Sequence, residues 1–471
     1  MDPVVPCGRE AGCDTMVTAG LRAAEFGYLD ERAQVYLDHA GAGLPPRSLV
    51  RAHAGRVAQE CFGNPHSQNP TSGRSGALLA EARSAVLRHF GADSAEYAAV
   101  FTANATGALR LVGEAYPFSS GGRLVLPMDN HNSVNGLREY ARASGTAVEY
   151  VPLGPDLRVS PERMVRALCP VRPGTGLLAF PAQSNFSGVR HPLEWVEEAR
   201  QRGYDTLLDA AAFVPANRLD LSRVRPDFIA VSWYKVFGYP TGIGCLVARR
   251  TALARLRRPW FAGGTIRIAS ARAGWHEMAD GEAAFEDGTV NFLSVPDVTA
   301  GLRWIDAIGM DAVHTHVSTL TGRLLAGLGA LRHSDGSALV RLYGPASCDR
   351  RGGTVALNLL DVRGRVVDER VVARDGGRQG ISLRTGCFCN PGAVEAAFSL
   401  DVPLLRSLAR RHARTIEEYL DGLGLASAGA VRVSVGIASN AADVDAFLAF
   451  VEETYRDREP DVEGLAPRDG C

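Results

Sequence analysis

The central part of the chain alternates short apolar segments with segments of helical periodicity. The apolar segments have the length of buried strands, and they lie at Ala98–Thr102, Arg123–Pro127, Gly176–Pro181, Thr206–Asp209, Asp227–Ser232 and Gly242–Ala248. Helical patterns such as Pro192–Arg202 separate several of them. This alternation predicts an α/β fold with a mostly parallel central sheet. The last segment follows its predecessor after a short Gly/Pro-rich turn, so we expect it to run antiparallel.

The C-terminal part has a different pattern and predicts a second, smaller α+β domain. Helices are expected at Leu302–Gly309, Val313–Leu331, Leu404–Leu423 and Asp443–Tyr455, and strands at Thr354–Leu359, Val366–Arg374 and Val431–Gly436. We expect a large domain over residues 28–295, whose first segment packs with the small domain at 296–456. Residues 1–27 and 457–471 lack clear periodicity, so we expect a flexible arm and a flexible tail.

The composition is that of an ordinary globular protein. The 471 residues are 46% hydrophobic and 22% charged, with a formal net charge of -1. No charge excess points to a nucleic acid or a membrane surface, and we find no signal peptide and no apolar run of membrane-spanning length. The nine cysteines are odd in number and scattered, which does not indicate a disulfide framework. We expect a cytoplasmic protein with reduced thiols and neither nucleic-acid nor membrane partners.

One feature of the composition bears on chemistry. Of 51 lysine and arginine residues, one is a lysine, Lys235, and the rest are arginine. The two cations replace each other readily on a solvated surface. An amine in a tuned pocket can lose its proton and attack a carbonyl, whereas a guanidinium stays protonated. Lys235 is therefore a candidate for amine chemistry, against the alternative of a solvated charge near a strand end.

Polar residues follow three of the predicted strands, at the sheet edge where open α/β folds bind ligands. The segment Phe101–Gly107 leads from a strand into a helix and carries Thr106, so it is either a phosphate cradle or a helix cap. Asp209 ends its strand and can pair with a protonated pyridine nitrogen or cap a helix. Ser232 and Lys235 leave the next strand together. Asp209 followed by this serine and lysine is a more specific signal of a functional site than either part alone.

Two further segments carry candidate chemistry. His131 follows the strand Arg123–Pro127, where a histidine can stack on a planar ring and move a proton, or be an ordinary loop residue. The loop Leu383–Gly392 contains Arg384, Cys387 and Cys389. A thiol near an arginine can be a nucleophile of lowered pKa. The alternatives are a buried structural cysteine or half a metal site, but no second cysteine pair stands at zinc-finger spacing, and we expect no metal.

Long motifs in this order resemble class V, fold-type I enzymes that use pyridoxal 5'-phosphate. Within that class the chain is most similar to the cysteine desulfurase domain of molybdenum cofactor sulfurases. The resemblance runs from about Tyr36 to about Phe447, and its motifs are Tyr36–Gly41, Phe62–Ser67, Phe180–Gly188, Ser232–Gly238 and Arg384–Gly392. It implies a pyridoxal-phosphate-dependent transferase fold of type I, with a large domain around the mostly parallel sheet and a small domain that carries the cysteine loop.

The resemblance also implies roles for individual residues. Lys235 carries the cofactor as a Schiff base and shuttles a proton, Asp209 pairs with the pyridinium, and His131 stacks on the ring. Phosphate contacts fall to Ala105, Thr106, Ser232 and Tyr234, where Tyr234 stands in place of a histidine of many relatives, and Thr289 completes the phosphate site of the neighbouring subunit of a homodimer. Asn185 lies beside the ring and the substrate, Arg432 clamps the substrate carboxylate with Arg384 nearby, and Cys389 is the nucleophile.

The implied reaction is desulfuration of L-cysteine, with a persulfide on Cys389, alanine as co-product and transfer of the sulfur to an acceptor. The acceptor stays open, since we expect no molybdopterin-binding domain after the desulfurase domain. Ala212 stands where iron–sulfur assembly relatives carry glutamine, and Val394 where sulfurases often carry a further cysteine. The alternatives are a pyridoxal-phosphate lyase or aminotransferase that forms no persulfide and acts on a sulfur-containing or other amino acid, and a non-enzymatic sulfur-carrier scaffold. Whether the substrate is L-cysteine or a related amino acid stays open.

Overall fold

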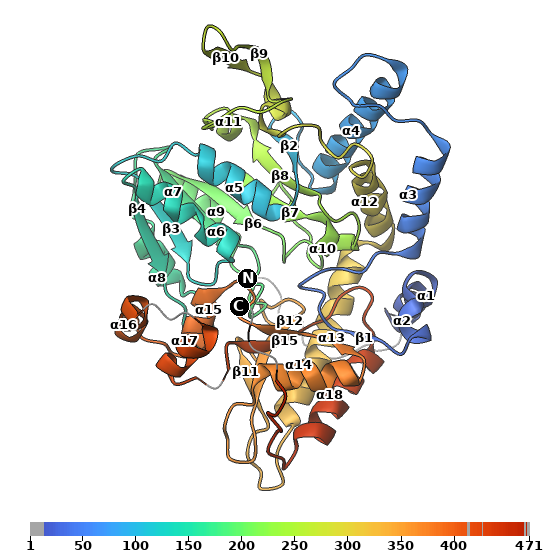
Figure 1. Cartoon of the computed structure of the whole chain (residues 1–471), viewed down its shortest axis with the longest axis vertical. Helices are drawn as coiled ribbons and strands as arrows, with labels where there is room; N and C mark the ends of the chain where they lie inside the picture. The colour runs from blue at the N-terminus through green and yellow to red at the C-terminus, as the bar shows by residue number, and fades with distance from the viewer. Residues whose placement is uncertain (1–13, 412–414, 426, 466–467, 469–471) are drawn as a thin grey trace.

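A seven-stranded sheet forms the centre of the large domain (Figure 1). The computed structural model describes residues 14–411, 415–425, 427–465 and 468. The strands are β2 (Tyr97–Thr102), β3 (Arg123–Pro127), β4 (Ala147–Val151), β5 (Gly176–Pro181), β6 (Tyr204–Asp209), β7 (Phe228–Ser232) and β8 (Gly244–Arg249). They are ordered β2-β8-β7-β6-β5-β3-β4, and β8 runs antiparallel to both neighbours while the other pairs are parallel. The predicted sheet and its antiparallel strand are confirmed.

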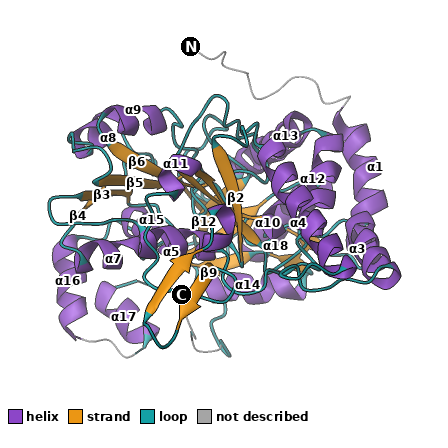
Figure 2. Ribbon diagram, turned by 90° about the horizontal axis from the view of Figure 1, so that it is seen from above, coloured by secondary structure: helices purple, strands orange, loops and turns teal. Residues whose placement is uncertain are grey.

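Helices cover both faces of this sheet (Figure 2). Alternate strand residues enter two separate cores, as in β5, where Leu178 and Phe180 face one core and Leu177 and Ala179 the other. The first core is closed by helices α4 (Pro70–His89), α8 (Pro161–Ala167), α9 (Trp195–Gln201), α10 (Trp233–Phe237) and α12 (Pro296–Ile308). The second is closed by α5 (Ala105–Ala115), α6 (Asn132–Asn135), α7 (Leu137–Ala143), α11 (Arg250–Leu253) and the 3-10 helix η1 (Gly281–Phe285).

The C-terminal part forms a second sheet with helices packed on it. Its four antiparallel strands, ordered β11-β12-β15-β14, are β11 (Val340–Tyr343), β12 (Thr354–Leu359), β14 (Arg384–Gly386) and β15 (Ala430–Ser434). The helices of this part are α13 (Met310–Ala330), α14 (Glu369–Arg378), α15 (Pro391–Ala397), α16 (Val402–Arg411), α17 (Ile416–Leu423) and α18 (Ala441–Tyr455). The domain boundary near residue 295 stays a prediction, because α12 buries Val298 in the large-domain core and Ile305 in the small-domain core.

The remaining elements connect or extend the two parts. The N-terminal helices are α1 (Asp14–Phe26), α2 (Tyr28–Glu31) and α3 (Arg47–Gln59). Strand β1 (Val35–Tyr36) pairs with β13 (Ile381–Ser382) and so joins the start of the chain to the small domain. Strands β9 (Ile266–Ser270) and β10 (Trp275–Met278) form a hairpin that stands apart at the top of Figure 1. In the described ranges, no helix combines the length and the apolar character that crossing a membrane requires.

The flexible ends stay a prediction, and the described residues near both ends make contacts with distant parts of the chain. Helix α1 buries Phe26 completely, and Arg22 pairs with Asp30 at 2.8 Å and Asp443 at 2.9 Å. Near the other end, Arg468 pairs with Asp368 and Glu369 at 2.9 and 3.0 Å. These contacts are distant in sequence, so no local periodicity reveals them. Residues 1–13, 466–467 and 469–471 lie outside the described part of the chain.

Two secondary-structure predictions in the small domain are corrected. Residues 366–374 were expected to form a strand, but helix α14 begins at Glu369, where the Asp368 side chain accepts a hydrogen bond from the Arg370 amide. The β-branched valines favour a strand locally, yet Val371 and Val372 are buried in the small-domain core as part of the helix. The single helix expected at 404–423 is two helices, α16 and α17.

Candidate active site

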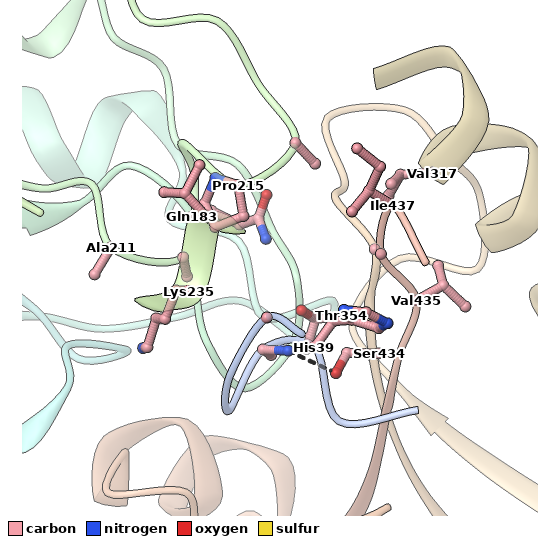
Figure 3. A pocket seen from close by; sticks show the side chains of 17 residues that line it. His39, Gln183, Ala211, Pro215, Lys235, Val317, Thr354, Ser434, Val435 and Ile437 are labelled. Carbon is pink, nitrogen blue, oxygen red and sulfur yellow. Dashed lines mark hydrogen bonds between the residues drawn. The ribbon is translucent and has the colours of Figure 1, made fainter. Parts of the chain in front are cut away.

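Lys235 is presented by a short helix that is anchored on both sides. Ser232 ends β7, and Trp233, Val236 and Phe237 of α10 are buried in the core. The helix ends at Gly238, whose φ is +71°, and a Cβ there would lie 2.1 Å from the carbonyl carbon of Leu44. Lys235 is only half-buried, because its side chain leaves the packed face. It lines a cavity of about 40 Å³ between the two domains, with Ala211 and Gln183 beside it and Thr354 and Val435 on the opposite wall (Figure 3).

Three of the predicted site residues interact electrostatically here. Burial lowers the pKa of the Lys235 amine, and Asp209 opposes this shift. Burial likewise lowers the pKa of His131, again against the attraction of Asp209. His131 Nδ1 accepts a hydrogen bond of 3.1 Å from the Ser133 amide, so the neutral ring carries its hydrogen on Nε2. Asp209 itself is buried at the end of β6 and accepts from the Ala211 amide at 3.0 Å.

Hydroxyl groups and a helix N-terminus form an anion cradle next to these residues. The side chain of Asn104 caps α5 by accepting from the Gly107 amide at 2.9 Å. The Ala105 amide donates to Ser232 Oγ at 2.9 Å, and the exposed Thr106 hydroxyl is hydrogen-bonded to Ser133 Oγ at 2.8 Å. Helix α5 directs its N-terminus and its dipole toward this point. Ser133 was missed by sequence reasoning, although it stands two residues after His131.

A buried arginine lies on the small-domain side of the site. Arg432 on β15 is 2% exposed, and it donates to Asp38 Oδ1 at 2.7 Å and to the backbone oxygen of Asn185 at 3.1 Å. Its guanidinium lies 4.7 Å from the Phe388 ring centroid. Arg384, 54% exposed at its side chain, lies 3.7 Å from the other Asp38 oxygen. Two guanidiniums share one carboxylate, so the cluster keeps a positive charge that suits the carboxylate of an amino acid. Asp38 was not predicted.

The cysteine loop crosses from the small domain to this cluster. Phe388 and Cys389 both have positive φ, +55° and +54°, which is strained for residues other than glycine. Cys389 is half-buried with a free thiol, and its backbone oxygen accepts from the Asn132 amide at 2.7 Å. The loop therefore sits beside His131. Cys387 is buried and disulfide-bonded, which corrects the expectation of reduced thiols at this position.

Two predicted phosphate contacts lie at the edge of the site. Tyr234 is half-buried, and burial raises the pKa of its hydroxyl. Thr289 is exposed and accepts a hydrogen bond of 3.2 Å from Asn64. It lines a cavity of about 320 Å³ together with Thr102, Ala103 and Gly107 at the start of α5 of the same chain. The structure contains one subunit, so the expected contact of Thr289 with the phosphate site of a neighbouring subunit stays a prediction. Within the described ranges, no group of His, Cys, Asp and Glu side chains has the geometry of a metal site.

A buried histidine behind Lys235 gives a pH-dependent prediction. Burial lowers the pKa of His39 from 6.5 to about 3, so between these values the unfolded chain binds a proton that the folded chain excludes. Stability is therefore present above pH 6.5 and is lost as the pH falls, by about 1.4 kcal/mol per pH unit. We expect His39→Gln to remove this contribution. Urea unfolding of both proteins between pH 5 and about 7 measures it, and parallel curves for the two proteins would rule it out.

The residues of the site match the requirements of pyridoxal 5'-phosphate. Its aldehyde needs an amine that can lose its proton, its ring nitrogen needs an anion, and its phosphate needs donors. Lys235 supplies the amine and Asp209 the anion. The phosphate donors are Thr106, Ser133 and the start of α5. Together with the doubly covered sheet and the small domain, this set defines a pyridoxal-phosphate enzyme of fold type I.

The chain belongs to the aminotransferase class-V family, whose model matches residues 35–447. It is 35% identical over 459 residues to the molybdenum cofactor sulfurase of Homo sapiens, covering 92% of this chain and 51% of the relative. Molybdenum cofactor sulfurase 3 of Aedes aegypti is 36% identical, and the match covers 92% of this chain and 57% of that relative. The chain thus spans about half the length of the curated relatives it matches.

Solved structures share the fold. The apo structure of a cysteine desulfurase from Thermococcus onnurineus NA1 superposes with a TM-score of 0.76 at 24% identity, covering 92% of this chain and 97% of that one. A cystine C–S lyase in complex with its product cysteine persulfide superposes with a TM-score of 0.70 at 18% identity, covering 92% and 100%.

Proposed function

We propose that this protein is a cysteine desulfurase that takes sulfur from L-cysteine as a persulfide on Cys389, releases alanine and passes the sulfur to an acceptor. One observation carries the proposal: the half-buried free thiol of Cys389 lies in a loop bound to Asn132, directly after His131. A lyase or an aminotransferase of this family has no need of a thiol at that point. The similarity to molybdenum cofactor sulfurases supports the same reaction.

Several residues of the site would bind different parts of the cofactor. Lys235 would hold pyridoxal 5'-phosphate covalently, Asp209 would pair with its ring nitrogen, and His131 would stack on the ring. The start of α5, with Ala105 and Thr106, would bind the phosphate together with Ser232 and Tyr234. When bound, the cofactor supplies an electron-withdrawing ring that stabilises negative charge at the α-carbon of an amino acid.

The remaining residues bind the substrate and move its proton. Arg432, with Arg384 at the entrance, binds the carboxylate of L-cysteine, and Asn185 contacts the substrate from the large domain. The lowered pKa of Lys235 leaves its amine neutral more readily, so it can take the proton from the α-carbon. Lys235 is thus the proton carrier in this proposal, and His131 handles protons of the substrate.

Cys389 carries the sulfur. Its thiolate attacks the sulfur atom of L-cysteine, a sulfur–sulfur bond forms, and the carbon–sulfur bond breaks with its electron pair left on the β-carbon. That carbon takes up a proton and leaves as alanine. One L-cysteine and one thiol thus give one alanine and one persulfide, without an outside oxidant or reductant. The acceptor is a molybdenum-cofactor-like or biosynthetic molecule, or a carrier protein. We also propose a cytoplasmic location, which would keep the free thiol of Cys389 reduced, although Cys387 is disulfide-bonded in the structure.

A lyase is the second candidate, favoured by the structural likeness to a cystine C–S lyase. The products separate the two, because elimination from L-cysteine gives pyruvate and ammonia whereas desulfuration gives alanine. We expect alanine in amounts equal to the sulfur transferred when the protein is incubated with L-cysteine and a thiol acceptor. Pyruvate as the main carbon product would favour the lyase.

We also propose a homodimer in which Thr289 reaches the phosphate site of the neighbouring subunit. Four large apolar side chains on and beside the β9–β10 hairpin are exposed, at 43 to 50%: Trp260, Phe261, Ile268 and Trp275. Exposed aromatic side chains gathered in this way are typical of an interface. The exposed Thr289 follows this segment, so the same surface can bring it to the neighbour.

The hairpin gives a direct test of the homodimer. Trp275→Glu puts a charge in the expected interface and should convert the dimer to a monomer at micromolar concentration, because an unpaired buried charge is costly. Val462→Glu, at another exposed apolar residue, is the control and should leave the mass unchanged. Sedimentation measures both variants. A wild-type chain that sediments as a monomer would refute the dimer.

A further inference from the structure

Three consecutive residues of the cysteine loop are bound by the large domain. The backbone oxygen of Phe388 accepts a hydrogen bond of 2.8 Å from Asn185 Nδ2. The backbone oxygen of Cys389 accepts from the Asn132 amide at 2.7 Å. Asn390 Nδ2 donates to the backbone oxygen of Asp129 at 2.7 Å and to Asn185 Oδ1 at 2.9 Å. The loop that carries the thiol is thus held before, at and after Cys389.

The Asn390 side chain does more than cap a helix. It is 0% exposed, and its oxygen caps α15 by accepting from the Ala393 amide at 3.2 Å. Both hydrogens of its amide nitrogen point the other way, to groups of the large domain. A serine or an aspartate would cap the helix equally well. The two donor bonds are the part of this arrangement that capping does not explain.

Asn185 connects the loop with the arginine cluster. Its side chain bonds to Phe388 and Asn390, while its backbone oxygen accepts from Arg432 Nη1 at 3.1 Å. Arg432 also lies over the ring of Phe388. Asn185 therefore connects the Arg432 guanidinium, bound at its backbone, with both residues that flank Cys389, bound at its side chain.

The backbone of the loop needs such support. Positive φ at two successive residues other than glycine costs on the order of 1 kcal/mol at each, and such strain persists only where the surroundings over-determine it. Phe388 and Cys389 are those two residues. If the bonds to the large domain are lost, the loop is expected to relax away from this conformation.

We propose that Asn390 is a positioning residue, which forms with Asn185 an amide latch that fixes Cys389 against the active site and links its placement to Arg432. The latch consists of the hydrogen bonds from Asn390 to Asp129 and Asn185 and from Asn185 to Phe388. The part of this proposal that concerns sulfur transfer rests on the proposed desulfurase function. The latch holds the thiol for attack on a bound substrate.

Asn390→Ser tests the latch because serine keeps the cap of α15 and removes the reach to the large domain. On the full chain with its cofactor, we expect alkylation of Cys389 by iodoacetamide to be about ten-fold faster, since lost hydrogen bonds shift a local opening equilibrium by roughly that factor. Mass spectrometry with fragmentation separates Cys389 from Cys387. Asn440→Ser, at the cap of α18 outside the site, is the matched control and should alkylate at the wild-type rate.

A kinetic measurement on the same variants separates positioning from substrate binding. In Asn390→Ser, kcat for persulfide formation should fall about ten-fold or more because the thiol is displaced. KM for L-cysteine should stay within about two-fold, because Arg432 keeps its hydrogen bonds to Asp38 and to the Asn185 backbone. Asn185→Ala serves as a second variant and should speed alkylation in the same way, so the test survives if Asn390→Ser does not fold.

The outcomes distinguish the latch from the proposed function. Wild-type alkylation rates in both latch variants, with unchanged thermal midpoints, would overturn the latch. Faster alkylation in a protein whose wild type forms no alanine from L-cysteine would leave the latch in place and remove the desulfurase function.

Discussion

Replacing Lys235 by arginine is expected to abolish turnover of L-cysteine, by at least about a thousand-fold, because one side chain both holds the cofactor and moves the proton. Arginine keeps the charge and most of the length, but it stays protonated and cannot attack an aldehyde. The expected result is a protein that folds, shows the thermal midpoint of the cofactor-free wild type and forms neither alanine nor persulfide. Alanine formation under saturating L-cysteine measures the loss.

The single lysine allows the cofactor attachment site to be identified by labelling. Because Lys235 is the single lysine of the sequence, reduction with borohydride after addition of pyridoxal 5'-phosphate should label one lysine peptide in the wild type and none in Lys235→Arg. Arg51→Lys adds an amine on an exposed position of α3 and should keep full activity without a second reduced label. Wild-type turnover by Lys235→Arg would exclude the assigned role.

Replacing Cys389 by serine should have the second large effect. The hydroxyl group is a far weaker nucleophile than a thiolate toward sulfur, so alanine formation and sulfur transfer should fall by about a thousand-fold or more. Binding of L-cysteine should be nearly unchanged, since Arg432 and Lys235 remain. Turnover with dithiothreitol as acceptor measures the loss.

Cys61 offers a matched control for this substitution. It is also a free cysteine, and it is exposed far from the cysteine loop in sequence. Cys61→Ser should transfer sulfur at the wild-type rate. Full sulfide release by Cys389→Ser, with pyruvate rather than alanine, would assign the protein to the lyases.

The parts of the fold that were predictable are those whose signal is local. Strands β3 and β5 have the predicted bounds because each is a short, continuously apolar segment buried on both faces. Asp209 and Lys235 were predicted together because each follows its own strand end, and parallel neighbours bring such ends to one edge. Strand β4 was missed, since this edge strand is only partly buried and lacks a continuous apolar run.

The parts that were missed depend on distant contacts. Asp38 faces Arg432 across 394 positions of sequence, and Asn390 meets Asn185 across 205. Neither residue has a local pattern that marks it, since an aspartate after a short strand and an asparagine in a Gly/Pro-rich loop are common. The capped helix α14 was mistaken for a strand because valine content outweighed the single cap signal of Asp368.

The direct test of the whole account is the mass of the peptide that contains Cys389 after one equivalent of L-cysteine, with no acceptor present. Desulfuration through this thiol predicts a gain of one sulfur atom on Cys389, and an equal amount of alanine in solution. An unmodified Cys389 thiol beside consumed L-cysteine would contradict the central claim.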